Sequence, residues 1–179
     1  MSAIADKIVV ISQSLACANI SHAFGGALAL AWCTERARGT IDIDVNIFVS
    51  VERVDHVVGA LPPEVRWTEA DRELLVRDGQ ARLWWDNTPV DVFLNTTEFH
   101  KHAALRARTE TFAGELIPFL ACSDLAVFKA FFNRTKDWAD LEEMVRSDTI
   151  DIDKVVGTIS RHLGPDDDRV ARLLSLRAG

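Results

Sequence analysis

The sequence has few cysteines, no long apolar run and no cluster of basic residues. Its three cysteines, Cys17, Cys33 and Cys122, are scattered and odd in number, and none has zinc-ligand spacing. This pattern argues against a disulfide framework, and we expect all three to be reduced core residues. No run approaches the roughly 18 apolar residues of a membrane span, and no basic leader precedes an apolar core at the N-terminus. We therefore expect a cytoplasmic protein without a membrane partner.

The chain is also poor in positive charge. Its formal net charge is −7 and its pI is near 5.2. This balance disfavours a broad nucleic-acid surface, because affinity for phosphates depends on clustered Lys and Arg. A local patch could still form from Arg36, Arg38, Lys129, Arg134 and Lys136, although scattered cations on an acidic protein usually form a solvated face.

The pattern of apolar residues predicts the fold class. With 179 residues, 48% of them hydrophobic, the chain can bury one sizeable core. Strand patterns are frequent up to about residue 119 and helical patterns follow. Asp78-Gly79 between apolar segments predicts a hairpin joining 74–77 to 81–85, and a strand over 90–94 makes the sheet mixed. We predict an α/β (α+β) fold, with a mixed β-sheet flanked by helices over residues 1–122 and a helical C-terminal extension over 123–179, packed on this core.

Residues 21–49 contain the most informative local pattern. We predict a short strand at His22–Phe24, a tight turn at Gly25-Gly26, a helix over Ala27–Thr34 and a strand over Thr40–Val49. Glycine lets a backbone approach a ligand closely, and the N–H groups at a helix start favour negative charge. The turn is therefore a candidate phosphate site.

Two acids lie on the strand that follows. Residues two apart in a strand point to one face, so Asp42 and Asp44 should project together, away from Ile41, Ile43 and Val45. Two carboxylates within about 4 Å repel by roughly 4 kcal/mol at an effective dielectric of about 20. A divalent cation relieves this repulsion, and hard oxygen ligands suit Mg²⁺. The turn and the acid pair together predict a nucleoside triphosphate site.

This order of strand, Gly-Gly, helix, short basic loop and Asp-x-Asp strand resembles the signature of the polymerase-beta-like nucleotidyltransferase superfamily. The resemblance implies a third carboxylate on a neighbouring strand, and the segment PVDVFLN places Asp91 between Val90 and Val92. Ala27 follows the glycines where many members carry Ser or Thr. The backbone amides of the turn must therefore serve without a hydroxyl group.

A second resemblance covers the C-terminal half. The segment SDLAVFKAFFNRTKDWADL is similar to the helical region that follows the catalytic domain in abortive-infection-toxin-type and minimal nucleotidyltransferases. This implies a triphosphate contact for Lys129, whose apolar neighbours also suit a surface lysine with a buried stem. Asp137 and Asp140 lie one helical turn apart and could orient Lys129 or Arg134, or cap the helix.

The pentapeptide TIDID occurs twice, at residues 40–44 and 149–153. The first copy follows the glycine turn and continues into a strand-like segment. The second continues into a helical pattern, in which Asp151 or Asp153 suits a helix cap. We predict that only the first copy binds metal.

Three further residues have two readings each. His22 adjoins the glycine turn and could contact substrate, but a lone histidine at a strand start is more often structural. Trp84 or Trp85 could stack on a nucleobase, but tryptophans in strands more often pack in the core. We assign none of them to the site.

The resemblance implies a Mg²⁺- or Mn²⁺-dependent enzyme that transfers a nucleoside monophosphate from a nucleoside triphosphate such as ATP and releases pyrophosphate. Asp42, Asp44 and Asp91 would be the metal ligands and catalytic acids, and Gly25, Gly26 and Lys129 would bind the nucleotide. The acidic charge favours a protein side chain or small molecule over tRNA as acceptor.

Two alternatives remain open. The first is a non-catalytic module of the same fold that binds a nucleotide or a protein, as an antitoxin-like or regulatory partner would. The second is a structural α/β domain, which requires all three motifs to be accidental.

Overall fold

The computed structural model describes residues 3–36 and 39–178, so Arg38 of the candidate basic patch lies outside the described residues. The chain forms two compact units. Unit 1 contains residues 1–26 and 39–120, and unit 2 contains residues 27–38 and 121–179. In the described part of the chain, no helix has both the length and the apolar character needed to cross a membrane.

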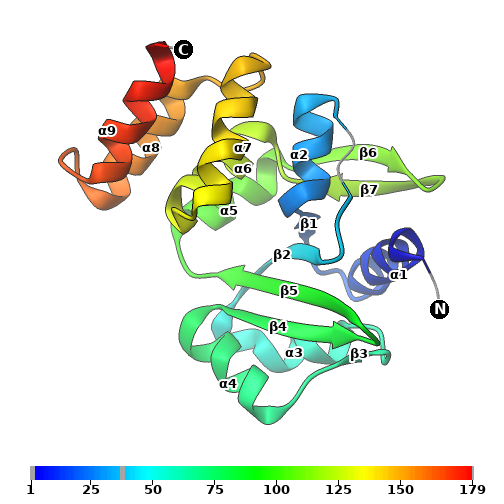
Figure 1. The fold of residues 1–179 in the computed structure, drawn as a ribbon. Coiled ribbons are helices and arrows are strands. Elements are labelled where there is room, and N and C mark those ends of the chain that lie inside the picture. Colours follow the sequence, from blue (N-terminus) through cyan, green and yellow to red (C-terminus); the bar gives the residue numbers. More distant parts are fainter. Residues whose placement is uncertain (1–2, 37–38, 179) are drawn as a thin grey trace. The chain divides into compact units, whose positions relative to one another are not determined.

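Unit 1 is built on a mixed sheet, which agrees with the predicted fold class (Figure 1). Within the described residues the strand order is β3-β4-β5-β2-β1-β7-β6. The pairs β2–β5 and β1–β7 are parallel, and the other neighbouring pairs are antiparallel. The strands are β1 (His22–Phe24), β2 (Ile43–Ser50), β3 (Val65–Arg66), β4 (Gln80–Trp85), β5 (Thr88–Asn95), β6 (Arg108–Phe112) and β7 (Glu115–Phe119).

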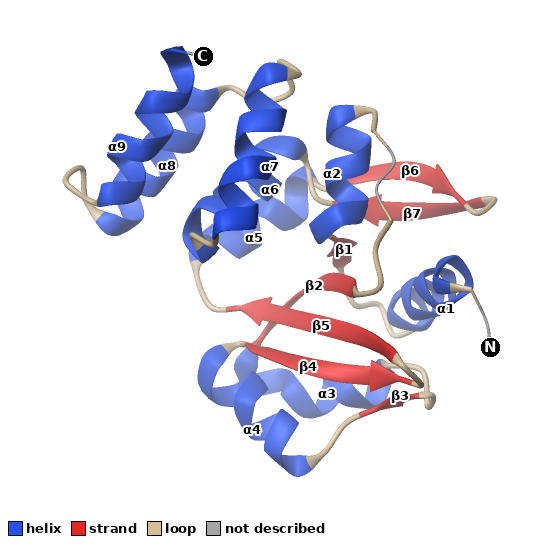
Figure 2. Cartoon of the chain, in the orientation of Figure 1, coloured by secondary structure: helices blue, strands red, loops and turns tan. Residues whose placement is uncertain are grey.

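Four helices and a 3-10 turn complete the described part of unit 1 (Figure 2). They are α1 (Ile4–Cys17), the 3-10 turn Val51–Arg53, α3 (Val54–Ala60), α4 (Glu69–Asp78) and α5 (Glu98–Arg106). Helix α1 buries Ile8, Ile11 and Leu15 completely, as their helical spacing predicts. The buried ammonium of Lys7 donates hydrogen bonds to the Trp85 carbonyl and the Thr88 hydroxyl, both at 2.9 Å. Helix α1 therefore holds the turn that joins β4 to β5.

The predicted hairpin around Asp78-Gly79 is wrong, because residues 74–77 belong to helix α4. The Thr68 hydroxyl caps this helix by accepting from the Asp71 N–H, and the Asp71 carboxylate accepts from the Thr68 N–H in return. Gly79 ends the helix in the left-handed conformation, with a φ of +69°. An Asp-Gly pair suits a helix end as well as a hairpin turn, and the cap eleven residues upstream decides between them.

Unit 2 contains helix α2 (Gly26–Thr34) from Ala27 onward, and four further helices with a terminal 3-10 turn within the described residues. These are α6 (Cys122–Phe132), α7 (Thr135–Arg146), α8 (Ile152–Leu163), α9 (Asp168–Ser175) and the 3-10 turn Leu176–Ala178. Trp138 of α7 is 1% exposed, and its indole N–H donates to the Asn133 side chain at 2.7 Å. The guanidinium of Arg172 in α9 lies over the Trp138 ring, with its Cζ atom 4.2 Å from the ring centroid.

The expectation of three reduced core cysteines is wrong. Cys33 of α2 and Cys122 of α6 form a disulfide, with their Cα atoms 5.6 Å apart, and Cys17 is exposed. The bridge joins residues 89 positions apart in the chain. Such a separation carries no local signal, so only the arrangement of α2 and α6 shows that these two cysteines can pair.

The disulfide makes a prediction about thiol chemistry. Protein purified without reductant and alkylated in denaturant should carry one label, on Cys17, and three labels after reduction, as counted by mass spectrometry. Reduction should also lower the free energy of unfolding by about 2–4 kcal/mol, because it releases a long loop in the unfolded chain. The Cys17→Ser variant is the control and should take no label before reduction. Three labels on unreduced wild-type protein would contradict the bridge.

Candidate active site

The turn at Gly25-Gly26 lies directly against the second acid of the Asp-x-Asp motif. The Gly25 N–H donates to the Asp44 carbonyl at 2.9 Å, which extends the antiparallel pairing of β1 with β2. Gly26 has a φ of +56°, and a Cβ added there would overlap the Asp44 carboxylate. A side chain at position 26 is therefore excluded twice, by backbone conformation and by space.

Two of the three predicted acids occupy paired positions on neighbouring strands. In the parallel β2–β5 pair, Asp44 lies opposite Asp91. The residues that flank Asp44, Ile43 and Val45, are fully buried, and so are Val90 and Val92 beside Asp91. The alternation expected from the sequence is present in both strands, with the acids on the less buried face.

Asp42 lies just before β2, because the strand begins at Ile43 and not at Thr40 as predicted. The side chain of Thr40 explains the difference. Its hydroxyl donates to the Asp42 carboxylate at 2.7 Å and lies 3.0 Å from the Asp42 carbonyl, which makes a local turn instead of a strand pairing. Asp42 is nonetheless part of the same charged cluster, because its carboxylate lies 3.9 Å from the guanidinium of Arg82.

Arg82 is the site residue that the sequence analysis missed. It lies opposite Asp91 in the β4–β5 hairpin, and its Nε and Nη2 atoms donate to the two Asp91 carboxylate oxygens, each at 2.7 Å. The pKa of Arg82 is raised above its usual value, first by the hydrogen bond and charge of Asp91 and then by the charges of Asp42 and Asp44. The Arg82 guanidinium therefore pairs with Asp91 and lies in the field of Asp42 and Asp44.

The sequence did contain a signal for Arg82. Asp86-Asn87 is a typical turn sequence, and the structure pairs the residues on either side of it, Trp85 with Thr88. Counting outward from this turn places Arg82 opposite Asp91, on the same face of the sheet. The pairing was thus readable once the hairpin register was counted.

The donor set fits a hard divalent cation in its chemistry. Asp42, Asp44 and Asp91 are three carboxylates that all act on Arg82, and carboxylate oxygens are the ligands that Mg²⁺ takes in proteins. As they stand, the described residues contain no group of three or more His, Cys, Asp or Glu side chains arranged to hold a metal ion. Both oxygens of Asp91 accept hydrogen bonds from Arg82.

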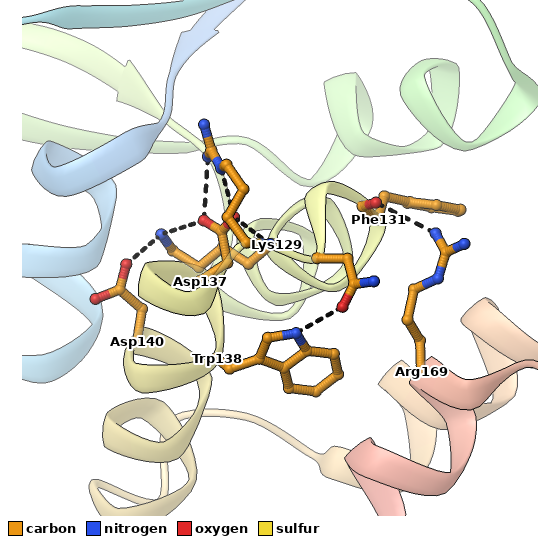
Figure 3. Close-up of polar contacts among 8 residues, drawn as sticks. Lys129, Phe131, Asp137, Trp138, Asp140 and Arg169 are labelled. Carbon is orange, nitrogen blue, oxygen red and sulfur yellow. Dashed lines mark hydrogen bonds and ion pairs between the residues drawn. The ribbon is translucent and has the colours of Figure 1, made fainter.

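Lys129 belongs to unit 2, where it is buried and paired with carboxylates (Figure 3). It is 6% exposed, and its ammonium donates to Asp140 at 2.7 Å and lies 3.8 Å from Asp137. Asp137 also accepts from the Arg134 N–H and its Nε, at 3.2 and 2.6 Å. Asp137 therefore caps helix α7 and orients two cations at once, which unites the two roles expected for it.

His22 has structural partners. It is 7% exposed, its Nδ1 donates to the Ile20 carbonyl at 3.0 Å, and its Nε2 is left to accept from the Ser12 hydroxyl at 2.9 Å. Burial lowers the pKa of His22. The imidazole therefore stays neutral and fastens β1 to α1. Of the two tryptophans, Trp85 is in the core and Trp84 is 46% exposed.

Comparison with known proteins identifies the fold of the chain and does not identify its family. No protein-family model and no curated protein sequence matches the chain. Among solved structures, the crystal structure of the nucleotidyltransferase ANT(2″)-Ia in complex with adenylyl-2″-tobramycin has a TM-score of 0.59 at 12% identity, and covers 97% of this chain and 97% of that one. This chain has a nucleotidyltransferase fold. The solution structure of the same antibiotic-resistance factor has a TM-score of 0.55 at 13% identity, over 97% of this chain and 89% of that one.

The two copies of TIDID allow a controlled test of the acid site. Asp151 caps helix α8 by accepting from the N–H groups of Asp153 and Lys154. The double variant Asp42→Asn/Asp44→Asn should lose Mn²⁺ binding in titration calorimetry with nucleotide present, because two carboxylate ligands are removed. Asp151→Asn/Asp153→Asn should bind Mn²⁺ as wild type does and lose only cap energy, about 1 kcal/mol per cap. Equal Mn²⁺ affinity in the two double variants would show that the first copy is not the metal site.

Proposed function

We propose that the protein is a nucleotidyltransferase that moves a nucleoside monophosphate from a nucleoside triphosphate to an acceptor and releases pyrophosphate. The observation that carries the proposal is the contact of the Gly25-Gly26 turn with Asp44, which is itself paired with Asp91 on the neighbouring strand. A phosphate-binding turn beside paired carboxylates suits phosphoryl transfer, in which catalysis is mainly positioning and charge neutralisation. The nucleotidyltransferase fold supports the same conclusion.

The three acids would bind metal, and one of them would also accept a proton. Asp42, Asp44 and Asp91 would hold Mg²⁺ or Mn²⁺, which neutralises phosphate charge and acts as a Lewis acid when bound. Asp91 would also accept the proton of the acceptor's hydroxyl or amino group. The acceptor atom then forms a bond to the α-phosphorus, the bond from that phosphorus to the bridging oxygen breaks, and pyrophosphate leaves with the electron pair.

The triphosphate requires positive groups of its own. The N–H groups that follow Gly25 and Gly26 at the start of α2 are suited to phosphate oxygens, because a helix N-terminus favours negative charge. We assign Lys129 to the β and γ phosphates. Its ammonium has three donors; among the described carboxylates, Asp140 lies within hydrogen-bonding distance and Asp137 lies 3.8 Å away.

The acceptor we favour is a protein side chain or a small hydroxylated or amino compound. A chain of net charge −7 lacks the several phosphate contacts that give nucleic-acid binding its strength. A structure of the same fold, ANT(2″)-Ia, was solved with adenylyl-2″-tobramycin, so the fold accommodates an adenylylated small molecule. Nucleic acid is the less favoured acceptor on charge.

A second candidate function has one observation in its favour. Asp91 is held at both oxygens by Arg82, and a non-catalytic nucleotide- or protein-binding module of this fold could keep that arrangement permanently. Such a module would be antitoxin-like or regulatory, and it would bind its ligand without turnover.

A transfer assay separates the two functions. Labelled nucleoside triphosphates with Mg²⁺ should transfer label to cell protein or to a panel of aminoglycosides and lincosamides, and Asp91→Asn should abolish the transfer. Label on total tRNA alone would overturn the choice of acceptor. If no acceptor is labelled while the nucleotide still binds, the binding module is the correct function.

The role of Lys129 can be tested apart from its contribution to folding. Lys129→Ala should weaken nucleotide binding at least about tenfold, because it removes a point charge from the phosphates. Asp140→Asn keeps the ammonium and removes its close partner, so nucleotide affinity should be retained or rise. Calorimetry checks both, with thermal unfolding as the measure of folding. Equal losses of affinity in the two variants would show that the Lys129–Asp140 pair is only structural.

A further inference from the structure

Arg82 is bound to the acid site as tightly as geometry allows. Two parallel N–H···O bonds of 2.7 Å join it to Asp91, and the same guanidinium lies 3.9 Å from Asp42. Such bidentate pairs are among the stronger ion pairs in proteins, and they use both carboxylate oxygens. A metal ion that binds Asp91 must therefore compete with Arg82 for the same oxygens.

The position of Arg82 comes from the backbone. Arg82 and Asp91 are directly opposed across the antiparallel β4–β5 pair, and Lys7 of α1 holds the turn of this hairpin through Trp85 and Thr88. The register cannot slip by one residue, because a slip would turn Leu83 and Val90, both fully buried, toward the opposite face. Arg82 is thus a fixed neighbour of the acids.

The Arg82 side chain is more exposed to solvent than the carboxylate that it binds. The side chain of Arg82 is 52% exposed, whereas that of Asp91 is 17% exposed. If Arg82 released Asp91, its guanidinium would move into water, which solvates it well, while Asp91 would stay on its strand. This difference in exposure suits the replacement of Arg82 by a metal ion at Asp91.

We propose that Arg82 is a positioning residue that acts as the counter-ion of the metal-free site. It holds Asp91 and balances the charge of Asp42 and Asp44 until the metal binds, and it then releases Asp91. This inference rests on the proposed function, since it assumes that the three acids bind a divalent cation.

Mn²⁺ titration of the full chain, without nucleotide, tests the competition. Arg82→Gln should lower the dissociation constant for Mn²⁺ about two- to fivefold, the range that corresponds to one exposed ion pair. Arg82→Lys keeps the charge without the bidentate geometry and should lie between Arg82→Gln and wild type. The matched control is Arg72→Gln, because Arg72 makes a bidentate pair with Asp55 away from the acids and should leave Mn²⁺ affinity unchanged.

A second measurement distinguishes a counter-ion from a residue that only supports the fold. Without metal, Arg82→Gln should melt at a lower temperature than wild type, because Asp91 loses its bidentate partner and Asp42 a nearby positive charge. Saturating Mn²⁺ should then raise the melting temperature of Arg82→Gln by more than that of wild type or Arg72→Gln. A purely structural arginine would give the same metal-induced increase in all three proteins.

The outcomes separate this inference from the proposed function. If wild type binds Mn²⁺ and Arg82→Gln binds it equally or more weakly, the counter-ion role is wrong and the metal site stands. If neither protein binds Mn²⁺, with or without ATP, the proposed metal site is wrong and the counter-ion role fails with it. Binding by Arg82→Gln alone would support the competition directly.

Discussion

The contact between Gly26 and the Asp44 carboxylate is the constraint on which the candidate site depends. The backbone at Gly26 is left-handed, and the space that a side chain would need is already taken by the acid. The Gly25 N–H completes the contact by donating to the Asp44 carbonyl. The Gly25-Gly26 turn and the strand that carries Asp44 are therefore packed together, and the position of one determines the position of the other. Pairing of β2 with β5 then adds Asp91 to this arrangement.

In both units, clustered carboxylates are paired with a basic side chain. In unit 1, Arg82 is shared by three carboxylates. In unit 2, the buried Lys129 is paired with Asp140 and lies near Asp137. Buried or half-buried charges are stable only when they are paired and hydrogen-bonded, so each acidic cluster carries its own cation. For the proposed chemistry, this means that ligands enter a site whose charges already have partners, and binding is an exchange of partners.

The successes and failures of the sequence analysis have physical causes. The strand at His22–Phe24 and the Asp151 cap of α8 were predicted correctly, because each depends on residues close together in the chain. Helix α4 was misread because an Asp-Gly pair ends helices as readily as it makes hairpins. The Cys33–Cys122 bridge depends on the packing of two helices, which local patterns do not encode.

The repeated pentapeptide TIDID shows which features the sequence determines locally and which depend on tertiary structure. The sequence by itself determined that TIDID at 40–44 leads into a strand and that TIDID at 149–153 begins a helix, because the following residues have different periods. It also determined that Asp44 and Asp91 each lie between aliphatic neighbours on a strand. Only the tertiary structure decided that these two acids are paired and which cysteines are joined, because both depend on the register and packing of elements that are distant in the chain.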